Sequence, residues 1–399
     1  MQKPKLNNTL LRKLFIAASI RRWNDQATPI EFVELDKQAH KMIIAYILGK
    51  FEEKEHQKQI DWEKLIEYFI FEFFARVVLT DIKPPIFYAL QKQHKKELAD
   101  FVLQALEEEI QSYPFLKKIG NYFQNTPQDI ESQILKAAHF YASKWEFDII
   151  YNFNPHMYDV RNIKDIIDKE VENHYHLSGM QQIILFDHLK RLITLFGQLR
   201  FQKRWSQTPR IPPTSVLGHT LIVAICAYLL SFDIKACRQM RINHFLCGLF
   251  HDLPEVLTRD IISPIKKGIK GLDAQIKELE SKEVEEKILK HLPQNISDDI
   301  KYYTENEFSN RYQIEGFIHY THDDSHQILT DFNLDHLNPV YGKFLKICDL
   351  LSAFLEAKIS ITHGITSIEL SEGANNILEK CGQTQINGID LGYIFREFR

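Results

Sequence analysis

Two long parts of this sequence repeat one another in the same order, and this repeat limits the fold more than any other feature. The run SIRRWNDQ before QAHKMIIAYIL is matched by FQKRWSQT before LGHTLIVAICAYLL. Farther along, VVLTDIKPPI is matched by EVLTRDIISPI, and LKAAHFYASKWEF by LKICDLLSAFLEA. Several matches in one order are not expected by chance. We therefore predict two tandem copies of one domain, over residues 1–178 and 179–399.

The matched segments are typical of helices. Apolar residues recur in them at helical spacing, and the alternation expected of strands is nearly absent. The predicted fold class is all-α, with two tandem helical bundles. The offset in residue number between matched positions is larger after the proline that VVLTDIKPPI and EVLTRDIISPI share. This predicts an insertion near residues 307–337 of the second copy.

Charge and composition exclude some partners. The formal net charge of −4 gives no broad electrostatic argument for nucleic acid. The longest apolar run, residues 221–230, covers about half a membrane span and predicts a core helix, so we expect no membrane partner. The five cysteines form no CxxC pair. We interpret them as buried, reduced thiols of a cytoplasmic protein.

Four ionisable residues of the second copy interrupt or end apolar helices: His219, His251, Asp252 and Asp349. Pro254 disfavours helical geometry at the preceding residue, so the backbone is expected to bend just after the His-Asp pair. Two imidazoles and two carboxylates suit a divalent Mn, Co, Fe, Ni, Zn or Mg ion. We predict that these four residues bind one such ion and leave coordination positions open for water and substrate.

The pattern His219, His251-Asp252, Asp349 resembles the HD-domain metal-dependent phosphohydrolases, and among them the bacterial 5'-deoxynucleotidases. Arg204-Trp205 before the first histidine, the run HDLPEVLTRD and a following Pro-x-Lys that ends at Lys266 carry the likeness. It covers most of the second copy. The resemblance implies an all-helical fold, one bound divalent metal ion and a small-molecule nucleotide substrate, a deoxynucleoside monophosphate that loses its phosphate.

The resemblance also suggests roles for individual residues. Glu255 would orient a metal-bound water or move its proton, and Arg204 would bind phosphate oxygens. Trp205 would form a wall of the sugar or base pocket. Asp260 would either hydrogen-bond the sugar or protonate the leaving oxygen, and Lys266 is a further candidate for the phosphate.

Simpler interpretations of the same residues stay open. Arg204 could belong to a solvated basic face, and Trp205 to the core. Glu255 could favour the N-terminus of a short helix that Pro254 opens, because a negative charge is stabilising there.

The first copy keeps Arg22, Trp23 and His40 but loses the central ligands. The matched positions hold Glu72-Phe73 or Phe73-Phe74 for the His-Asp pair, His139 for Asp349 and Val77 for Glu255. Phenylalanine cannot bind a metal, so we predict a degenerate, non-catalytic copy. A rearranged site of His40, Glu72 and His139 is the alternative. Related nucleotidases are often dimers, which suggests a homo-oligomer or an intramolecular pseudo-dimer of the two copies.

The insertion contains HYTHDDSHQ, which we interpret as placing His319, His322 and His326 on one helical face. A second metal ion there would make the protein a dinuclear phosphodiesterase or nuclease. A polar lid or surface helix is the simpler interpretation. A third alternative is a non-catalytic protein that senses nucleotides with the same fold.

Overall fold

A computed structural model describes residues 2–56, 59–80, 82–125, 127–258, 271–321 and 325–398. The chain forms two compact units. We call Thr9–Lys190 the N-unit, and Met1–Asn8 together with Arg191–Arg399 the C-unit. The chain therefore enters the C-unit twice.

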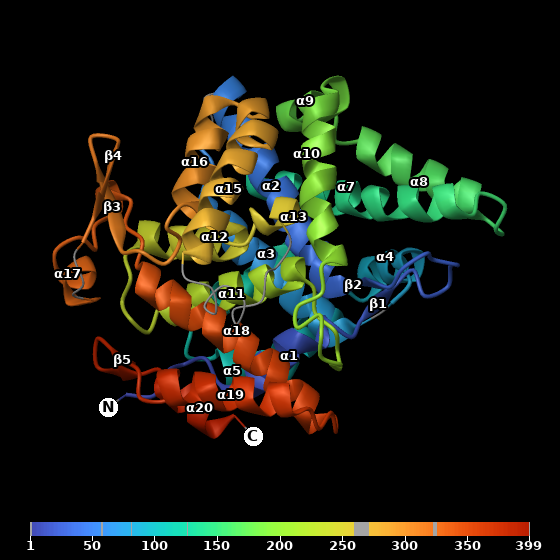
Figure 1. The fold of residues 1–399 in the computed structure, drawn as a ribbon. Coiled ribbons are helices and arrows are strands. Elements are labelled where there is room, and N and C mark those ends of the chain that lie inside the picture. Colours follow the sequence, from blue (N-terminus) through green and yellow to red (C-terminus); the bar gives the residue numbers. More distant parts are fainter. Residues whose placement is uncertain are drawn as a thin grey trace. The chain divides into compact units, whose positions relative to one another are not determined.

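The N-unit begins with a helix and a short two-stranded sheet and continues as helices (Figure 1). Its elements are α1 (Asn8–Ile16), β1 (Arg21–Arg22), β2 (Phe32–Val33), α2 (Glu34–His56), α3 (Trp62–Leu79), α4 (Pro84–Gln93), α5 (Lys95–Ile110), α6 (Leu116–Asn125), α7 (Ile130–Phe153), α8 (Val160–Glu172) and α9 (Ser178–Leu185). Helix α10 (Asp187–Gly197) follows and spans the division between the units.

The C-unit is also mainly helical. Its elements are η1 (Gln198–Phe201), α11 (Val216–Ser231), α12 (Arg238–Phe250), α13 (Glu255–Thr258), α15 (Leu272–Lys287), η2 (Leu289–His291), α16 (Gln294–Thr304), β3 (Arg311–Ile314), β4 (Phe317–Tyr320), α17 (Ser325–Thr330), η3 (Asp335–Leu337), α18 (Gly342–Thr362), α19 (Ile368–Cys381), β5 (Gln385–Ile386), β6 (Ile389–Asp390) and α20 (Gly392–Glu397).

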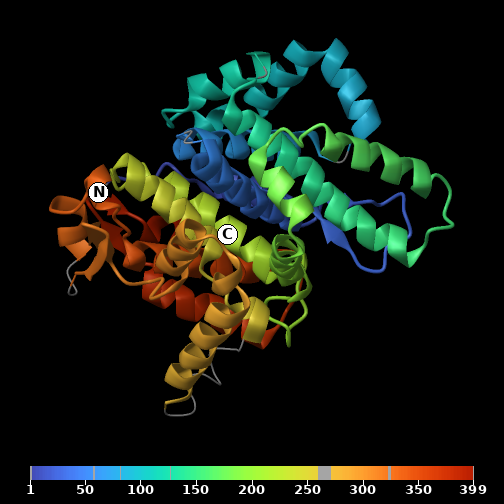
Figure 2. The same cartoon turned by 90° about the horizontal axis from the view of Figure 1, so that it is seen from above.

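In the N-unit, α2 packs against α7 and α9, and α7 also packs against α3 and α8. Helices α7 and α8 lie side by side in both views (Figures 1 and 2). Helix α7 begins where the Asp129 carboxylate accepts a hydrogen bond from the Ser132 N–H at 3.0 Å, which caps an otherwise unpaired donor. The apolar faces of these helices form the core of the unit.

The packing of α9 explains why the N-unit extends past the joint that the repeat predicted after residue 178. Helix α9 lies against α2. A Cβ atom at Gly179 would stand 2.8 Å from the Leu48 Cα atom, so glycine permits this close approach. The compact units divide at Lys190–Arg191, and the boundary of the repeat after residue 178 stays a prediction.

Helix α11 is the centre of the C-unit, and all 16 of its residues are buried. The Ser215 hydroxyl caps it by accepting from the Gly218 N–H at 2.9 Å. Helices α12 and α18 pack on α11, and α19 packs on α18. The first residues of the chain join this unit, since the Asp390 N–H donates to the Gln2 carbonyl at 3.0 Å and the Lys5 N–H to Asp233 at 3.1 Å.

The predicted all-α class is confirmed, with three two-stranded sheets as additions in the described residues. One local expectation is wrong: His319 lies on strand β4, paired with β3, and not on a helix. No helix among the described residues has the length and apolar character needed to cross a membrane. All five cysteines are unpaired, and four of them are buried.

Candidate metal centre

Three segments of the C-unit bring the four predicted ligands together. His219 comes from the first turn of α11, His251 and Asp252 follow α12, and Asp349 lies on α18. The His219 Nε2 atom is 3.0 Å from Asp349 Oδ1 and 3.9 Å from Asp252 Oδ2. The His251 Nε2 atom is 3.3 Å from Asp252 Oδ1 and 3.9 Å from Asp349 Oδ1. Ligand atoms of His219, His251 and Asp252 all lie within 4.8 Å of one another.

The bend after the His-Asp pair is present. Helix α12 ends at Phe250, and the His251 N–H still donates to the Cys247 carbonyl at 2.9 Å. Residues 251–254 form turns, and α13 then begins at Glu255. This break lets two adjacent side chains face one point, whereas neighbours in a continuous helix diverge.

Each imidazole is held through its Nδ1 atom. The His251 Nδ1 donates to the Gly248 carbonyl at 2.8 Å. The His219 Nδ1 lies 3.0 Å from the Ser352 hydroxyl and 3.3 Å from Glu356 Oε1. With the proton on Nδ1, the Nε2 lone pair of each ring can bind a metal ion.

The His251 Nε2 atom supports that assignment directly. It is buried and makes no hydrogen bond to another described residue. Its nearest acceptor is Asp252 Oδ1 at 3.3 Å, and a buried polar atom that makes no hydrogen bond calls for an explanation. Two nitrogen and two carboxylate donors around one point fit a divalent metal ion, which would satisfy this atom.

The field at this centre is negative. Burial and Arg204 alone would lower the pKa of His219, but its hydrogen bonds with Asp349 and Glu356 raise that pKa to about 9. Burial would raise the pKa of Asp349, yet its contacts with His219 and His251 hold it well below its ordinary value. The carboxylates are therefore ionised and attract a cation.

Glu356 is a residue of this centre that the sequence did not single out. It is buried and accepts hydrogen bonds from Trp205 Nε1 and Thr214 Oγ1, both at 2.9 Å. It lies seven residues after Asp349 on α18, so the two carboxylates share one helix face. This spacing from Asp349 is the sequence signal that could have identified Glu356.

A second residue that was not predicted is Lys346, which lies one turn before Asp349. Its Nζ atom is 2.6 Å from Asp349 Oδ2. The same atom stands 4.2 Å from the centre of the Phe308 ring. Because the ammonium pairs with a predicted metal ligand, it competes with a metal ion for one carboxylate oxygen.

The remaining predicted site residues are only partly described. Arg204 is mostly buried, with its Nε atom 3.9 Å from Glu356 Oε2. Trp205 donates its indole N–H to Glu356 and packs on Gly373. Glu255 opens α13, as the simpler interpretation expected, and its carbonyl accepts from Gln202. Asp260, Lys266 and His322 lie outside the described residues, as does the side chain of His326.

Of the three histidines predicted in the insertion, His319 has a described side chain, and its described contacts do not involve the metal centre. His319 is exposed on β4 and stacks on Tyr312, with 5.5 Å between ring centres.

The matched positions of the N-unit hold a different set of contacts. His139 Nδ1 lies 2.6 Å from Lys37 Nζ, and Glu72 pairs with Lys41. His40 meets Trp145 edge-on, with 5.0 Å between ring centres. Three converging His, Cys, Asp or Glu ligands are not found among the described residues of this unit. The buried Phe73, Phe74 and Val77 side chains belong to its core.

Comparisons with known proteins agree with this geometry. A family model described as HD domain matches residues 196–378, which include all four candidate ligands. A 5'-deoxynucleotidase of Vibrio atlanticus (strain LGP32) is 28% identical over 123 residues, or 30% of this chain and 59% of that relative. The chain therefore spans less than two thirds of the relative's length. The resemblance predicted from the motifs is confirmed, since residues 196–378 of this chain match an HD domain and part of the chain is similar to a 5'-deoxynucleotidase.

Proposed function

We propose that the C-unit is a metal-dependent phosphomonoesterase that acts on nucleotides. Its proposed substrates are deoxyribonucleoside 5'-monophosphates, which it converts to nucleoside and phosphate. The convergence of His219, His251 and Asp252, with Asp349 3.0 Å from His219 and a buried His251 Nε2 atom that lacks a hydrogen bond, carries this proposal. The similarity to a 5'-deoxynucleotidase supports the substrate class.

The four converging side chains would hold one divalent ion, either Mn, Co, Fe, Ni, Zn or Mg. When bound, such an ion polarises a phosphoryl oxygen and lowers the pKa of a coordinated water. The Gly248 carbonyl and the Glu356 carboxylate fix the orientation of the two imidazoles.

Other residues would act on the substrate itself. The Arg204 guanidinium is a planar donor for two phosphate oxygens, and Glu356 beneath it holds that group in place. Glu255 would accept the proton of the attacking water. The Trp205 N–H is already used by Glu356, so its ring would contact sugar or base by its face. Asp260 and Lys266 keep the roles that the resemblance implies, in contact with the leaving group or sugar and with phosphate.

The N-unit is proposed to be a degenerate, non-catalytic copy of the same domain. Trp23 Nε1 donates to Glu146 at 2.9 Å, as Trp205 does to Glu356, which supports a common origin. The unpaired cysteines of the chain support a cytoplasmic location for the whole protein. The homo-oligomer and the intramolecular pseudo-dimer both stay predictions.

Phosphate release tests the proposal. A panel of ribo- and deoxyribonucleoside monophosphates and a phosphodiester would be assayed with Mn, Co or Mg, using wild type, Asp252→Ala and Glu255→Ala. Asp298→Ala, an exposed carboxylate of the same unit, is the matched control. We expect Asp252→Ala to abolish activity and Glu255→Ala to lower kcat by about 100-fold or more.

Several results would contradict the proposal in different ways. Equal release by wild type and both site variants would refute the residue assignments. Cleavage of the phosphodiester in preference to all monophosphates would favour the dinuclear alternative. Nucleotide binding without phosphate release, unchanged by metal, would favour a sensing protein.

A further inference from the structure

The local backbone shows which residue of the N-unit corresponds to His219. Strand β1 pairs Arg21 with Val33, and in the C-unit an isolated bridge pairs Lys203 with Ser215. Both partners are shifted by the same 182 positions (21 to 203, 33 to 215). The tryptophans that follow, Trp23 and Trp205, obey this shift and share a left-handed backbone with φ of 56°.

The same shift relates His219 to Lys37 and not to His40. Glu146 on α7 and Glu356 on α18 also correspond, because each accepts a hydrogen bond from the matched tryptophan. Their numbers differ by 210, which is the shift for these two helices. That shift relates Asp349 to His139. The contact of Lys37 Nζ with His139 Nδ1 at 2.6 Å thus stands where His219 meets Asp349 at 3.0 Å. The sequence match of His40 with His219 was wrong by about one helical turn.

We propose that two buried lysines, Lys37 and Lys41, have replaced the metal ion in the N-unit and exclude it. Both side chains are completely buried. The Lys37 nitrogen occupies the position of the first histidine ligand, bonded to His139. Lys41 supplies the positive charge and pairs with Glu72. The proposal concerns the N-unit alone and does not require the C-unit to be catalytic.

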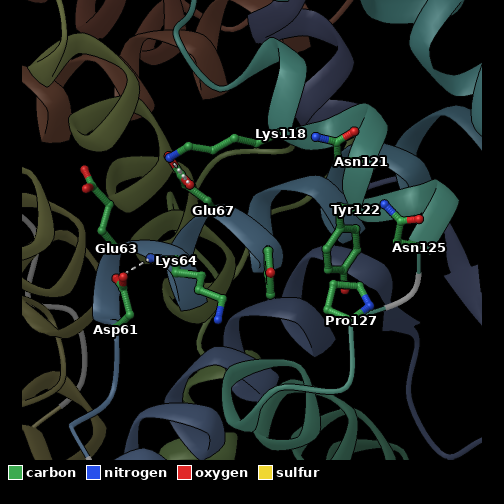
Figure 3. A pocket seen from close by; sticks show the side chains of 10 residues that line it. Asp61, Glu63, Lys64, Glu67, Lys118, Asn121, Tyr122, Asn125 and Pro127 are labelled. Atoms are coloured by element: carbon green, nitrogen blue, oxygen red, sulfur yellow. Dashed lines mark hydrogen bonds and ion pairs between the residues drawn. The ribbon is translucent and has the colours of Figure 1, made fainter.

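Both carboxylate oxygens of Glu72 are engaged. One pairs with Lys41, and the other accepts a hydrogen bond from the Tyr122 hydroxyl at 2.5 Å. Tyr122 also lines a hollow of about 390 Å³ beside α3 and α6, whose polar walls include Lys64, Lys118 and Asn121 (Figure 3). A metal ion at Glu72 would therefore have to compete with the Lys41 ammonium for this carboxylate.

Arg22 is also held by ion pairs within the N-unit. Its guanidinium contacts Glu146 and Glu34, both at 2.8 Å, while Arg204 of the C-unit is 3.9 Å from its carboxylate. The arginine that would bind phosphate in the C-unit is thus used internally in the N-unit. A centre whose charges are paired among themselves needs no ion to be stable.

The field at this position has the opposite sign to that in the C-unit. Burial, together with Lys37, Lys41 and Arg22, holds the pKa of His139 well below its ordinary value. Burial and the Arg22 charge likewise lower the pKa of Lys37. Surroundings that disfavour a proton on these bases also disfavour a divalent cation.

Metal counting on the full chain tests the proposal. In an Asp252→Ala/Asp349→Ala background, which disables the C-unit centre, we expect no bound Co(II) by elemental analysis after equilibration and gel filtration. Adding Lys37→His and Lys41→Met should open the N-unit centre and restore one Co(II) per chain, with the absorption of a nitrogen-ligated ion. Adding His139→Ala should remove that ion again.

Two outcomes would overturn the proposal. One is a Co(II) ion in the background variant that is lost with His139→Ala, because the lysines would then not exclude metal. The other is a folded Lys37→His/Lys41→Met variant, checked by circular dichroism, that still binds none. Metal binding by the unsubstituted chain is scored separately and bears only on the C-unit centre.

Discussion

At the scale of single residues, Glu356 connects the candidate ligand His219 with Arg204 and Trp205. Glu356→Gln keeps its shape and removes its charge. We expect metal affinity to fall by about 10- to 100-fold, as for other groups that orient a metal-binding histidine. Titration with Co(II), followed by absorption, measures the loss.

Glu146→Gln is the internal control for that variant. Glu146 accepts from Trp23 as Glu356 does from Trp205, but it lies in the other unit. It should leave Co(II) affinity unchanged while lowering thermal stability to a similar extent. Equal affinities in the two variants would mean that Glu356 only holds the fold.

The proton on His219 predicts how metal uptake depends on pH. Its pKa is raised to about 9, so the metal-free chain carries this proton at neutral pH, and binding must displace it. The apparent affinity should therefore rise with pH up to about 9, by up to tenfold per unit. Calorimetry in buffers of different ionisation enthalpy at pH 7.5 should show proton release. Uptake without release would contradict the assignment.

A different buried histidine predicts acid sensitivity of the C-unit. His244 lies near Ser231, its Nε2 accepts from the Tyr341 N–H at 3.1 Å, and burial lowers its pKa to about 3. The unfolded chain binds this proton below about 6.5, so stability is present above that pH and is lost as pH falls toward 3. We expect a loss of about 2 kcal/mol between pH 7 and 5 from this group.

Urea unfolding at the two pH values measures that loss. His244→Gln can still accept from Tyr341 but cannot be protonated in this range, so its stability should depend less on pH. An unchanged pH dependence in this variant would assign the acid sensitivity to other groups.

At the scale of elements, the contact of α11 with α12 positions two ligand segments. A Cβ atom on Gly248 would stand 2.7 Å from the Ala224 Cα atom, which is backbone and cannot move aside. Gly248→Ala should therefore push the helices apart, cost about 1–3 kcal/mol and weaken metal binding, since His251 lies one turn away. Chemical unfolding and Co(II) titration measure both effects.

Gly120 offers a comparison on another helix. A Cβ there would be 3.6 Å from a Leu103 methyl carbon, an ordinary contact. Gly120→Ala should be neutral or stabilising by up to about 1 kcal/mol, because alanine favours helix. Similar losses in both variants would show that packing at Gly248 is not special.

The long helices could be predicted from sequence because a helix that buries one face needs apolar residues at helical spacing. The core helix expected over residues 221–230 lies in α11, and the matched runs LKAAHFYASKWEF and LKICDLLSAFLEA lie in α7 and α18. The β3–β4 hairpin was missed because histidine spacing was read as helical. Its signal was the pair Glu315-Gly316, which has positive φ at both residues, as the central pair of a two-residue hairpin turn requires.

At the scale of the whole molecule, the ordered motifs were enough to predict that four side chains converge in the C-unit, but not which residues support them. The spacing from Asp349 places Glu356 on the same helix face, but sequence does not reveal its burial, which depends on α18 packing against α11. Lys37 was missed because matching letters favoured His40, whereas strand pairing, which sequence does not reveal, decides the register.

The return of residues Met1–Asn8 to the C-unit makes that unit discontinuous in sequence. A fragment of residues 179–399 would lack the Gln2 and Lys5 contacts with Asp390 and Asp233. The N-unit is thus a long insertion, and the chain continues into the C-unit at both of its ends. One proteolytic nick near Lys190 should leave the two pieces noncovalently associated in native gels and separable only in denaturant, so the protein is suited to being expressed as two complementing halves.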